Sequence, residues 1–215
     1  MRSLVALSML CSALCPGVVS AQPFAFGVKG GIRATDDFTG DSPPTAESKR
    51  YIAGPTVELR LPWHLAFEFD ALYRRIGYTD FFSSALANST TRERDNSWEF
   101  PLILKRRFWH GPVQPFAGIG YDPRRVTGSA VSSGLFLSGL GSFTFYENVK
   151  STRNFPVTHG LVLSGGVDLS AGHVHLAPEL RYVHWNEPFL PSGFNNFQFQ
   201  SAQDELFFLV GITFR

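Results

Sequence analysis

Residues 65–75 read LAFEFDALYRR, and their side chains alternate in character along the stretch. One set of alternate positions is apolar or aromatic, and it consists of Leu65, Phe67, Phe69, Ala71 and Tyr73. The positions between them carry most of the charge, as Glu68, Asp70 and Arg74. A period of two is typical of a β-strand, whose successive side chains point to opposite faces. The stretch therefore predicts a strand with one apolar face and one charged face.

The same alternation recurs in seven further segments, at residues 23–33, 51–61, 97–108, 113–124, 157–170, 174–182 and 205–215. Short connections fall at 62–64, 109–112 and 171–173, whereas long polar ones fall at 34–48, 79–94, 125–154 and 186–203. Short and long connections alternate, which is the pattern of four antiparallel hairpins. The sequence predicts an all-β protein of eight antiparallel strands in up-and-down order.

Composition narrows the function classes. The 215 residues are 44% hydrophobic and 17% charged, with 21 Phe and 20 Gly, which favours one β domain. The formal net charge is +1, so no basic surface for nucleic acid is expected. No segment has the roughly 20 uninterrupted apolar residues of a membrane helix.

The first 21 residues are typical of a cleaved signal peptide. Arg2 precedes an apolar run, and Val19 and Ala21 are the small residues of a cleavage site. We expect a mature domain of residues 22–215, without either cysteine, because Cys11 and Cys15 belong to the signal. A lipoprotein attached through Cys15 is a weaker alternative, because Leu14 is bulky where small residues are usual.

Alternation alone does not say which face meets water. A soluble lipocalin-like barrel turns its apolar face inward. A membrane barrel turns its apolar face to lipid and its polar face to the lumen. Three features favour the membrane: short turns at one end with long loops at the other, aromatics sorted by strand end, and balanced charge on the polar face. We expect short periplasmic turns and long extracellular loops.

The polar face carries eight bases and eight acids, which is what an enclosed lumen requires, since an unpaired buried ion costs several kcal/mol. An eight-stranded barrel is just wide enough for side chains to fill it. The expected lumen charge network is Lys29, Arg33, Glu58, Arg60, Glu68, Asp70, Arg74, Glu99, Lys105, Arg107, Asp122, Arg124, Asp168, Glu179, Arg181 and Glu205.

Large aromatic side chains are expected to form two belts, one at each membrane interface, where amphipathic rings gather. The belt at the short turns consists of Trp63 and Trp109. The belt near the long loops consists of Tyr73, Tyr78, Trp98, Tyr121, Tyr182 and Trp185.

With its signal peptide, its alternating hairpins and its last strand LFFLVGITFR, the chain resembles the outer-membrane-protein β-barrel domain family, the small eight-stranded barrels of bacterial outer membranes. The resemblance covers Pro23 to Arg215 and implies a location in the bacterial outer membrane. It also implies that Phe214 is the aromatic assembly signal read by the barrel-assembly machinery, although Arg215 follows it.

Residues capable of catalysis or metal binding are few. His159 and Ser164 are separated by an odd number of positions, so a regular strand turns them to opposite faces. His173 and His175 share a face, and the acids Asp36, Asp37 and Asp41 form a loop cluster, but neither group is a full ligand set. We expect no cofactor and no resident metal.

The leading hypothesis is a non-enzymatic, monomeric, porin-like envelope protein that contacts outer-membrane lipid and uses its loops for structure or surface interaction. Phenylalanines in the loops 126–154 and 188–200 either contact an unknown extracellular ligand or continue the strands above the membrane. The alternatives are a barrel enzyme acting on outer-leaflet lipid, such as a lipid-modifying hydrolase, and a soluble periplasmic lipocalin-like binder. The sequence leaves open the loop ligand and a narrow ion path.

Overall fold

The computed structural model describes residues 24–40, 44–84, 87–137, 143–191 and 199–215. The expected signal segment 1–21 lies outside the described residues. Eight strands form the barrel wall: β1 (Phe24–Arg33), β4 (Tyr51–Arg60), β5 (Leu65–Asp70), β8 (Leu102–Arg107), β9 (Val113–Leu137), β11 (Thr158–Ala171), β12 (Val174–Trp185) and β14 (Asp204–Phe214). Among the described residues, no helix has the length and apolarity needed to cross a membrane.

The eight strands close into a ring of antiparallel neighbours. The order is β1, β4, β5, β8, β9, β11, β12 and β14, and β14 pairs with β1, for example Val28 with Ile212. The closure fixes which residues lie side by side, because every wall strand has a partner on both edges. The predicted eight-stranded antiparallel barrel is therefore confirmed.

Two long strands of the barrel are each interrupted by one or two residues that are not in a strand. β5 gives way to β6 (Leu72–Ser83) at Ala71, and β7 (Ala87–Glu99) gives way to β8 at Phe100 and Pro101. Proline has no N–H to donate to a neighbouring strand. Its carbonyl instead accepts the Asp70 N–H at 3.1 Å, and the Asp122 carboxylate accepts the Phe100 N–H at 3.0 Å. These bonds satisfy the backbone at the interruption.

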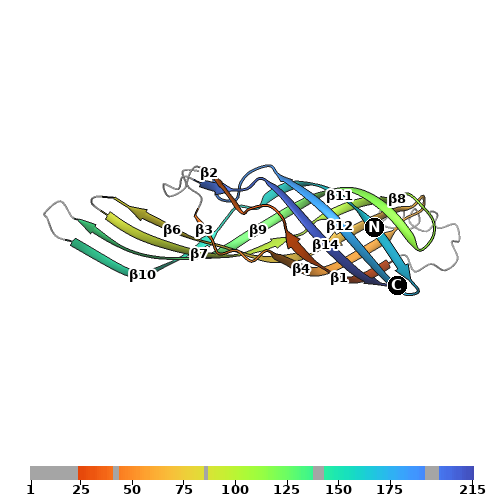
Figure 1. Ribbon diagram of the computed structural model, residues 1–215, viewed down its shortest axis with the longest axis horizontal. Coiled ribbons are helices and arrows are strands. Elements are labelled where there is room, and N and C mark those ends of the chain that lie inside the picture. The colour runs from red at the N-terminus through yellow and green to blue at the C-terminus, as the bar shows by residue number, and fades with distance from the viewer. Residues whose placement is uncertain (1–23, 41–43, 85–86, 138–142, 192–198) are drawn as a thin grey trace, which may run out of the picture.

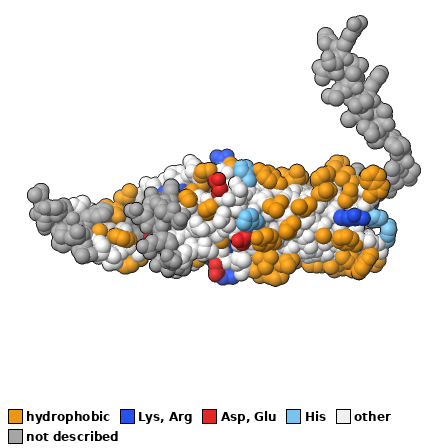
Figure 2. Space-filling model, turned by 90° about the horizontal axis from the view of Figure 1, so that it is seen from above, with side chains coloured by type: hydrophobic (Ala, Val, Ile, Leu, Met, Phe, Trp, Pro, Cys, Tyr) orange, Lys and Arg blue, Asp and Glu red, His pale blue; other side chains and the backbone are white. Residues whose placement is uncertain are grey.

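The outer surface of the barrel is apolar. Hydrophobic side chains gather over the barrel and thin out towards the extended end (Figure 2). Phe26 and Ile119, at 66% and 54% exposure, are typical of this belt. A soluble protein rarely leaves so much contiguous apolar surface in water, whereas lipid accommodates it. The soluble lipocalin-like alternative is therefore wrong.

The stretch 65–75 shows the inversion directly. Phe67 and Phe69 are 41% and 46% exposed on the outer wall, while Glu68 and Asp70 are 4% and 0% exposed inside. The charged face is the interior of the molecule and the aromatic face is its exterior.

Four strands extend well beyond the barrel. β6, β7, the second half of β9 and β10 (Phe143–Asn154) continue away from the wall as one antiparallel sheet (Figure 1). Tyr78 pairs with Glu93 across β6 and β7, and Ala130 pairs with Ser151 across β9 and β10. Much of the segments 79–94 and 125–154 is therefore strand, whereas the sequence predicted long polar loops there. In these segments the strands continue beyond the barrel.

A small cap lies above the end of the barrel opposite the short turns. β2 (Phe38–Gly40) and β13 (Phe199–Ser201) form a two-stranded sheet, and β3 (Thr45–Ala46) pairs with β6. An apolar cluster packs β2 and β13 against β6 and β9, and its members are Phe38, Ile76, Tyr78, Val126, Phe189, Leu190 and Phe199. We call this group the cap cluster.

Two members of the expected aromatic belts are corrected here. Tyr78 is fully buried in the cap cluster, and Trp185 is fully buried in the barrel beneath it. The physical reason is strand parity: Tyr73 and Tyr182 point outward, so residues an odd number of positions away on the same strand point inward. Both side chains therefore lie inside the molecule and not on its outer wall.

Candidate functional site

The lumen of the barrel holds its charges in layers. The middle layer contains three bases, Lys29, Lys105 and Arg181, and three acids, Glu68, Asp70 and Glu179, all at 4% exposure or less. They come from β1, β5, β8 and β12, which the ring brings to face one another across the interior. Equal numbers of opposite charges make this layer neutral.

Ion pairs connect the charged side chains of the middle layer to one another. Lys29 Nζ lies 2.5 Å from Glu68 Oε1 and 2.8 Å from Glu179 Oε2. Arg181 lies 2.7 Å from Glu179 and 2.9 Å from Asp70. Loss of one partner would leave an uncompensated buried charge, which costs about 3–5 kcal/mol.

A second layer lies nearer the short turns. Arg107 bridges Glu58 at 2.6 Å and Asp168 at 3.0 Å, and Arg60 lies 2.8 Å from Glu58. His175 completes it, with Nδ1 3.1 Å from Asp168 Oδ1. We call this group the turn-end layer.

The third layer, the mouth layer, lies beneath the cap. Arg74 bridges Glu99 and Glu205, both at 2.8 Å, and Arg124 lies 3.1 Å from Glu205. Arg33 and Asp37 join at 2.5 Å. The mouth layer and middle layer are separated by an apolar group made of Ile52, Leu72, Ile103, Val162, Val183, Trp185, Phe207 and Leu209.

Aromatic rings inside the lumen contact the cations directly. The Arg124 guanidinium lies 3.7 Å from the Trp185 ring centre and 5.0 Å from that of Phe189. Lys105 Nζ lies 4.4 Å from the Phe116 ring centre. A cation over an aromatic face is attracted by the ring quadrupole. The Arg74 guanidinium likewise lies 5.7 Å from the ring centre of the inward Phe207. Phe116 and Phe207 therefore fit the polar interior although both stand at positions where the alternation has polar residues.

Glycines let the wall strands approach closely. A Cβ on Gly27 or Gly31 would lie 1.9 Å from a backbone carbonyl oxygen of β14. No other residue fits at such a distance without moving the neighbouring strand. At Gly118 a Cβ would instead meet the Ser164 hydroxyl at 2.7 Å and the Lys105 stem at 3.2 Å.

The sixteen charged residues expected in the lumen all lie on the inward face. Fifteen are buried, and Arg60, at the turn end, has a side-chain exposure of 19%. Among the expected belt residues, Trp63 and Trp109 are 84% and 64% exposed at the short turns. Tyr73, Trp98, Tyr121 and Tyr182 lie on the outer wall near the other end, and Tyr73 packs 5.2 Å from Trp98.

Among the described residues, four buried Asp, Glu and His side chains were not in the expected lumen network. Asp37 bridges Arg33 and Arg74 in the mouth layer, and His175 bonds Asp168 in the turn-end layer. Glu93 and Asp95 are buried on the inner face of β7, above the mouth layer. Strand parity could have found the last two, because Glu99 points inward and its alternate neighbours share that face.

Glu93 and Asp95 form an acidic pair in the extended sheet. The Tyr78 hydroxyl donates to Glu93 Oε2 at 2.5 Å, and the Arg153 guanidinium lies 3.8 Å from Glu93. Both Asp95 oxygens lack a hydrogen-bond partner within the described residues. Burial, with the adjacent Glu93 carboxylate, raises the pKa of Asp95 to about 7. Burial and the same carboxylate raise the pKa of Tyr78 above its ordinary value.

The residues weighed for catalysis are not brought together. In β11, His159 is exposed on the outer wall and bonded to the Tyr121 hydroxyl, whereas Ser164 is buried on the inner face. No observation in the described residues favours the lipid-modifying alternative.

The weighed metal ligands are also separated. His173 is exposed near the Arg215 carbonyl, while His175 faces the lumen. Asp36 is exposed beside Arg50, whereas Asp37 is buried, and Asp41 lies outside the described residues. In the part of the chain that the structure describes, no group of three or more His, Cys, Asp or Glu could hold a metal ion.

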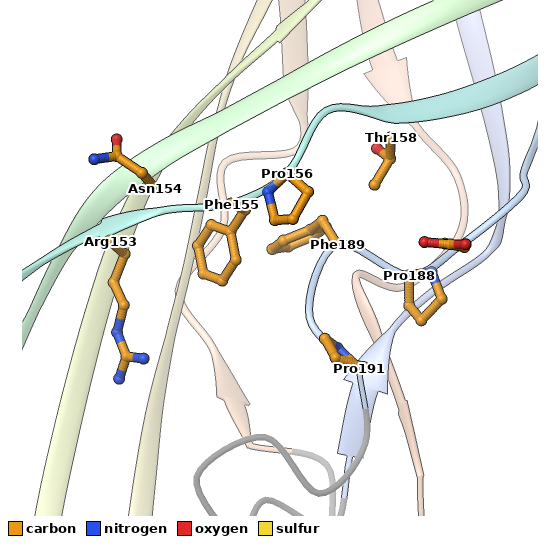
Figure 3. Close-up of a pocket in the computed structure, with 9 residues that line it drawn as sticks. Arg153, Asn154, Phe155, Pro156, Thr158, Pro188, Phe189 and Pro191 are labelled. Carbon is orange, nitrogen blue, oxygen red and sulfur yellow. The ribbon is translucent and has the colours of Figure 1, made fainter.

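A cavity of about 390 Å³ opens beside the cap. Phe155, Pro156, Phe189 and Pro191 point into one apolar space, with Arg153 on one side and Thr158 on another (Figure 3). The rings of Phe155 and Phe189 meet edge to face at 5.4 Å. The cavity is lined by the segment before β11 and by the segment after β12, so the barrel wall positions both sides of it.

A fold comparison supports the class of protein that this geometry defines. The chain is similar to Neisserial surface protein A, with a TM-score of 0.51 and 14% identity over 91% of this chain and 98% of that one. It is also similar to outer membrane protein OprG from Pseudomonas aeruginosa, with a TM-score of 0.50 and 14% identity over 89% and 94% of the two chains. No protein-family model and no curated protein matches the sequence.

The wall of paired strands, the apolar exterior and the charged interior define a small transmembrane β-barrel. Its fold is that of the eight-stranded barrels of bacterial outer membranes. At 14% identity the likeness speaks for the fold alone.

Proposed function

We propose that the protein is a non-enzymatic, monomeric outer-membrane barrel whose filled lumen anchors it and whose extended sheet makes surface contacts. The single observation that carries the proposal is the contrast between a lumen crowded with bridged charges and an extended sheet with exposed apolar rings. A rigid scaffold that carries a projecting surface is the usual arrangement of a binding protein.

The packing of the lumen supports an anchor rather than a wide pore. The cavity among Lys29, Glu68, Lys105 and Arg107 has a volume of about 10 Å³. That is roughly the space of one water molecule. Ions would have to displace bridged side chains to pass, so we expect no steady conductance.

Surface contact is supported by the exposed rings of the extended sheet. Phe81 and Phe145 are 67% and 65% exposed, and they flank a groove of about 300 Å³ that includes Thr90 and Ser133. Apolar rings around a few polar groups are typical of a binding surface. We predict that an extracellular ligand binds at this surface and at the cavity shown in Figure 3.

A trimmed variant separates the two parts of the proposal. Tyr78 pairs with Glu93 and Ala130 with Ser151, so an Asn-Gly turn can replace residues 79–92 and another can replace 131–150. A strain lacking the protein is complemented with the full chain or with the trimmed variant. Detergent sensitivity reports envelope integrity, and whole-cell adhesion reports surface contact.

We expect both forms to restore detergent resistance and only the full chain to restore adhesion. Equal adhesion by the trimmed variant would contradict the role of the extended sheet. Altered outer-leaflet lipid in the deletion strain, restored by the full chain, would favour the enzyme instead. Steady conductance of the purified protein in planar bilayers would contradict the closed lumen.

Recognition by the barrel-assembly machinery is proposed for the last strand. Phe214 is 47% exposed on the outer wall at the end of β14, where an assembly factor can reach it. We expect Phe214→Ala to lower the amount of folded protein in the outer membrane several-fold, read from the heat-modifiable band on gels. Thr213→Ala, on the inward face, is the matched control. An unchanged yield of Phe214→Ala would rule out this signal.

A further inference from the structure

Two short turns meet at the end of the barrel opposite the cap. The turn between β4 and β5 contains Trp63 and His64, and the turn between β8 and β9 contains Trp109 and His110. They are neighbours because β5 pairs with β8, and because the Arg107 N–H donates to the His64 carbonyl at 2.9 Å. The barrel wall therefore holds the two turns together.

The two histidine rings face each other across this gap. Their Nε2 atoms lie 2.6 Å apart, the ring centres 4.2 Å apart, and the ring planes at 89°. Both side chains are exposed, so a solute from the adjacent compartment can reach them. Among the described histidines, this is the pair whose ring nitrogens lie within hydrogen-bonding distance of each other.

The backbone of the first turn is unusual. Trp63 and His64 both have a φ of 63°, in the left-handed region that non-glycine residues rarely adopt. Two-residue hairpin turns of this kind prefer Asn and Gly. In the second turn Gly111, with a φ of 115°, follows His110, and a Cβ there would touch nothing within 4 Å. Local preference does not explain a Trp-His pair, and such outliers gather at functional sites.

Imidazole nitrogen is a preferred ligand of Zn²⁺, Cu²⁺ and Ni²⁺. In a tetrahedral site with metal–nitrogen bonds of about 2.0–2.1 Å, two ligand nitrogens lie roughly 3.3 Å apart. The 2.6 Å separation needs to widen by less than 1 Å, which small rotations of two exposed rings supply. Water would occupy the remaining ligand positions.

We propose that His64 and His110 together bind one Zn²⁺, Cu²⁺ or Ni²⁺ ion at the short-turn end of the barrel. The site is independent of the surface contacts proposed for the extended sheet, because it lies at the opposite end of the molecule. Its two ligands come from different hairpins, so a bound ion would also tie these hairpins together.

The test uses the refolded full chain in detergent, prepared without a histidine tag. Calorimetric titration with Zn²⁺ should give one ion per chain, with an affinity in the micromolar range. Cu²⁺ should quench part of the tryptophan fluorescence, because Trp63 and Trp109 are the sequence neighbours of the two ligands. EDTA should reverse both signals.

His64→Gln and His110→Gln should each weaken Zn²⁺ binding at least tenfold and reduce the Cu²⁺ quenching. His173→Gln is the matched control, because His173 is an exposed histidine of the third turn, beside the Arg215 carbonyl. It should leave both signals unchanged. The heat-modifiable gel shift establishes that each variant is folded.

The proposal is overturned if the folded wild-type chain takes up no stoichiometric Zn²⁺. It is also overturned if either glutamine variant binds Zn²⁺ as tightly as the wild type. In both cases the two rings make only a hydrogen bond to each other.

Discussion

The lumen and the extended sheet bury charge in different ways. In the lumen, each base of the middle layer has at least two acids within 3.4 Å. In the extended sheet, Glu93 and Asp95 are as deeply buried, yet neither Asp95 oxygen has a hydrogen-bond partner among the described residues. The middle layer balances its acids with an equal number of bases, whereas the two acids of the extended sheet share one nearby base, Arg153.

The two regions therefore differ in what a buried charge costs. In the lumen each ion depends on its partners, because removal of one partner leaves the other charge buried and uncompensated. An uncompensated carboxylate destabilises its surroundings unless it binds a proton. We therefore expect the lumen to resist changes of pH and the extended sheet to respond to them.

The largest expected effect is at the centre of the lumen. Glu179→Gln removes the acid that bridges Lys29, Lys105 and Arg181, and leaves three buried bases with two acids. We expect a loss of about 3–5 kcal/mol in the free energy of unfolding. Urea unfolding of the protein in lipid vesicles measures it. A loss below 1 kcal/mol would mean that the layers contribute little to stability.

The next largest effect is expected at Asp95, where removal of the charge should raise the free energy of unfolding instead of lowering it. Its pKa rises from 3.8 to about 7 on folding, so between these values the folded chain binds more protons than the unfolded chain. Stability from this group is therefore lost as pH rises, by up to about 4 kcal/mol when both states are ionised. Asp95→Asn does not ionise, and it should stabilise the protein at pH 8 but leave its stability at pH 4 unchanged.

Thermal unfolding at both pH values checks the Asp95 prediction, with hydrogen exchange of β7 as the local readout. Comparison of variant with wild type at each pH cancels the titration of other groups. Ser97→Ala is the control, because Ser97 is buried on the same face of β7 and carries no charge. Equal destabilisation of Asp95→Asn at both pH values would show that the carboxylate is ionised and satisfied in the folded state.

A smaller effect is expected at the aromatic belt. Trp98 is 42% exposed and packs 5.2 Å from the Tyr73 ring. Trp98→Ala should cost about 1 kcal/mol, the usual worth of an aromatic pair. Trp98→Phe should retain most of it, and unfolding in vesicles distinguishes them. No difference between the two variants would argue against a contribution from the ring at this position.

The smallest effect is expected at the surface pair of Asp36 and Arg50, whose side chains are 86% and 65% exposed. Solvent screens such a pair, so Asp36→Asn should leave the unfolding midpoint unchanged. A measurable loss of stability in Asp36→Asn would contradict the expected difference between exposed and enclosed ion pairs.

The alternation of the sequence predicted much of this molecule. Once the apolar face of residues 65–75 is assigned to lipid, parity along each strand indicates which charges point inward, from Lys29 on β1 to Glu205 on β14. Parity also predicts that Tyr78, Trp185 and Asp95 point inward. Tyr78 and Trp185 were expected in the belts because of their chemical type, but their position on the strand is the stronger signal.

Other features could not be read from the chain. The segments 79–94 and 125–154 are polar because they lie beyond the membrane, so their strands lack the apolar alternation that marks the wall. The contact of His64 with His110 joins residues 46 positions apart through the pairing of β5 with β8. Nothing in either turn indicates the other.

The eight wall strands and the two unlike faces of each strand can be predicted from the sequence, because side-chain alternation is a local property of an extended chain. Which charges meet, such as Lys29 with Glu179 across 150 positions, depends on the folded barrel. Ring closure and stagger set those partners, since they fix which inward side chains share a level of the lumen. The same closure brings two turns together at one end and projects four strands at the other.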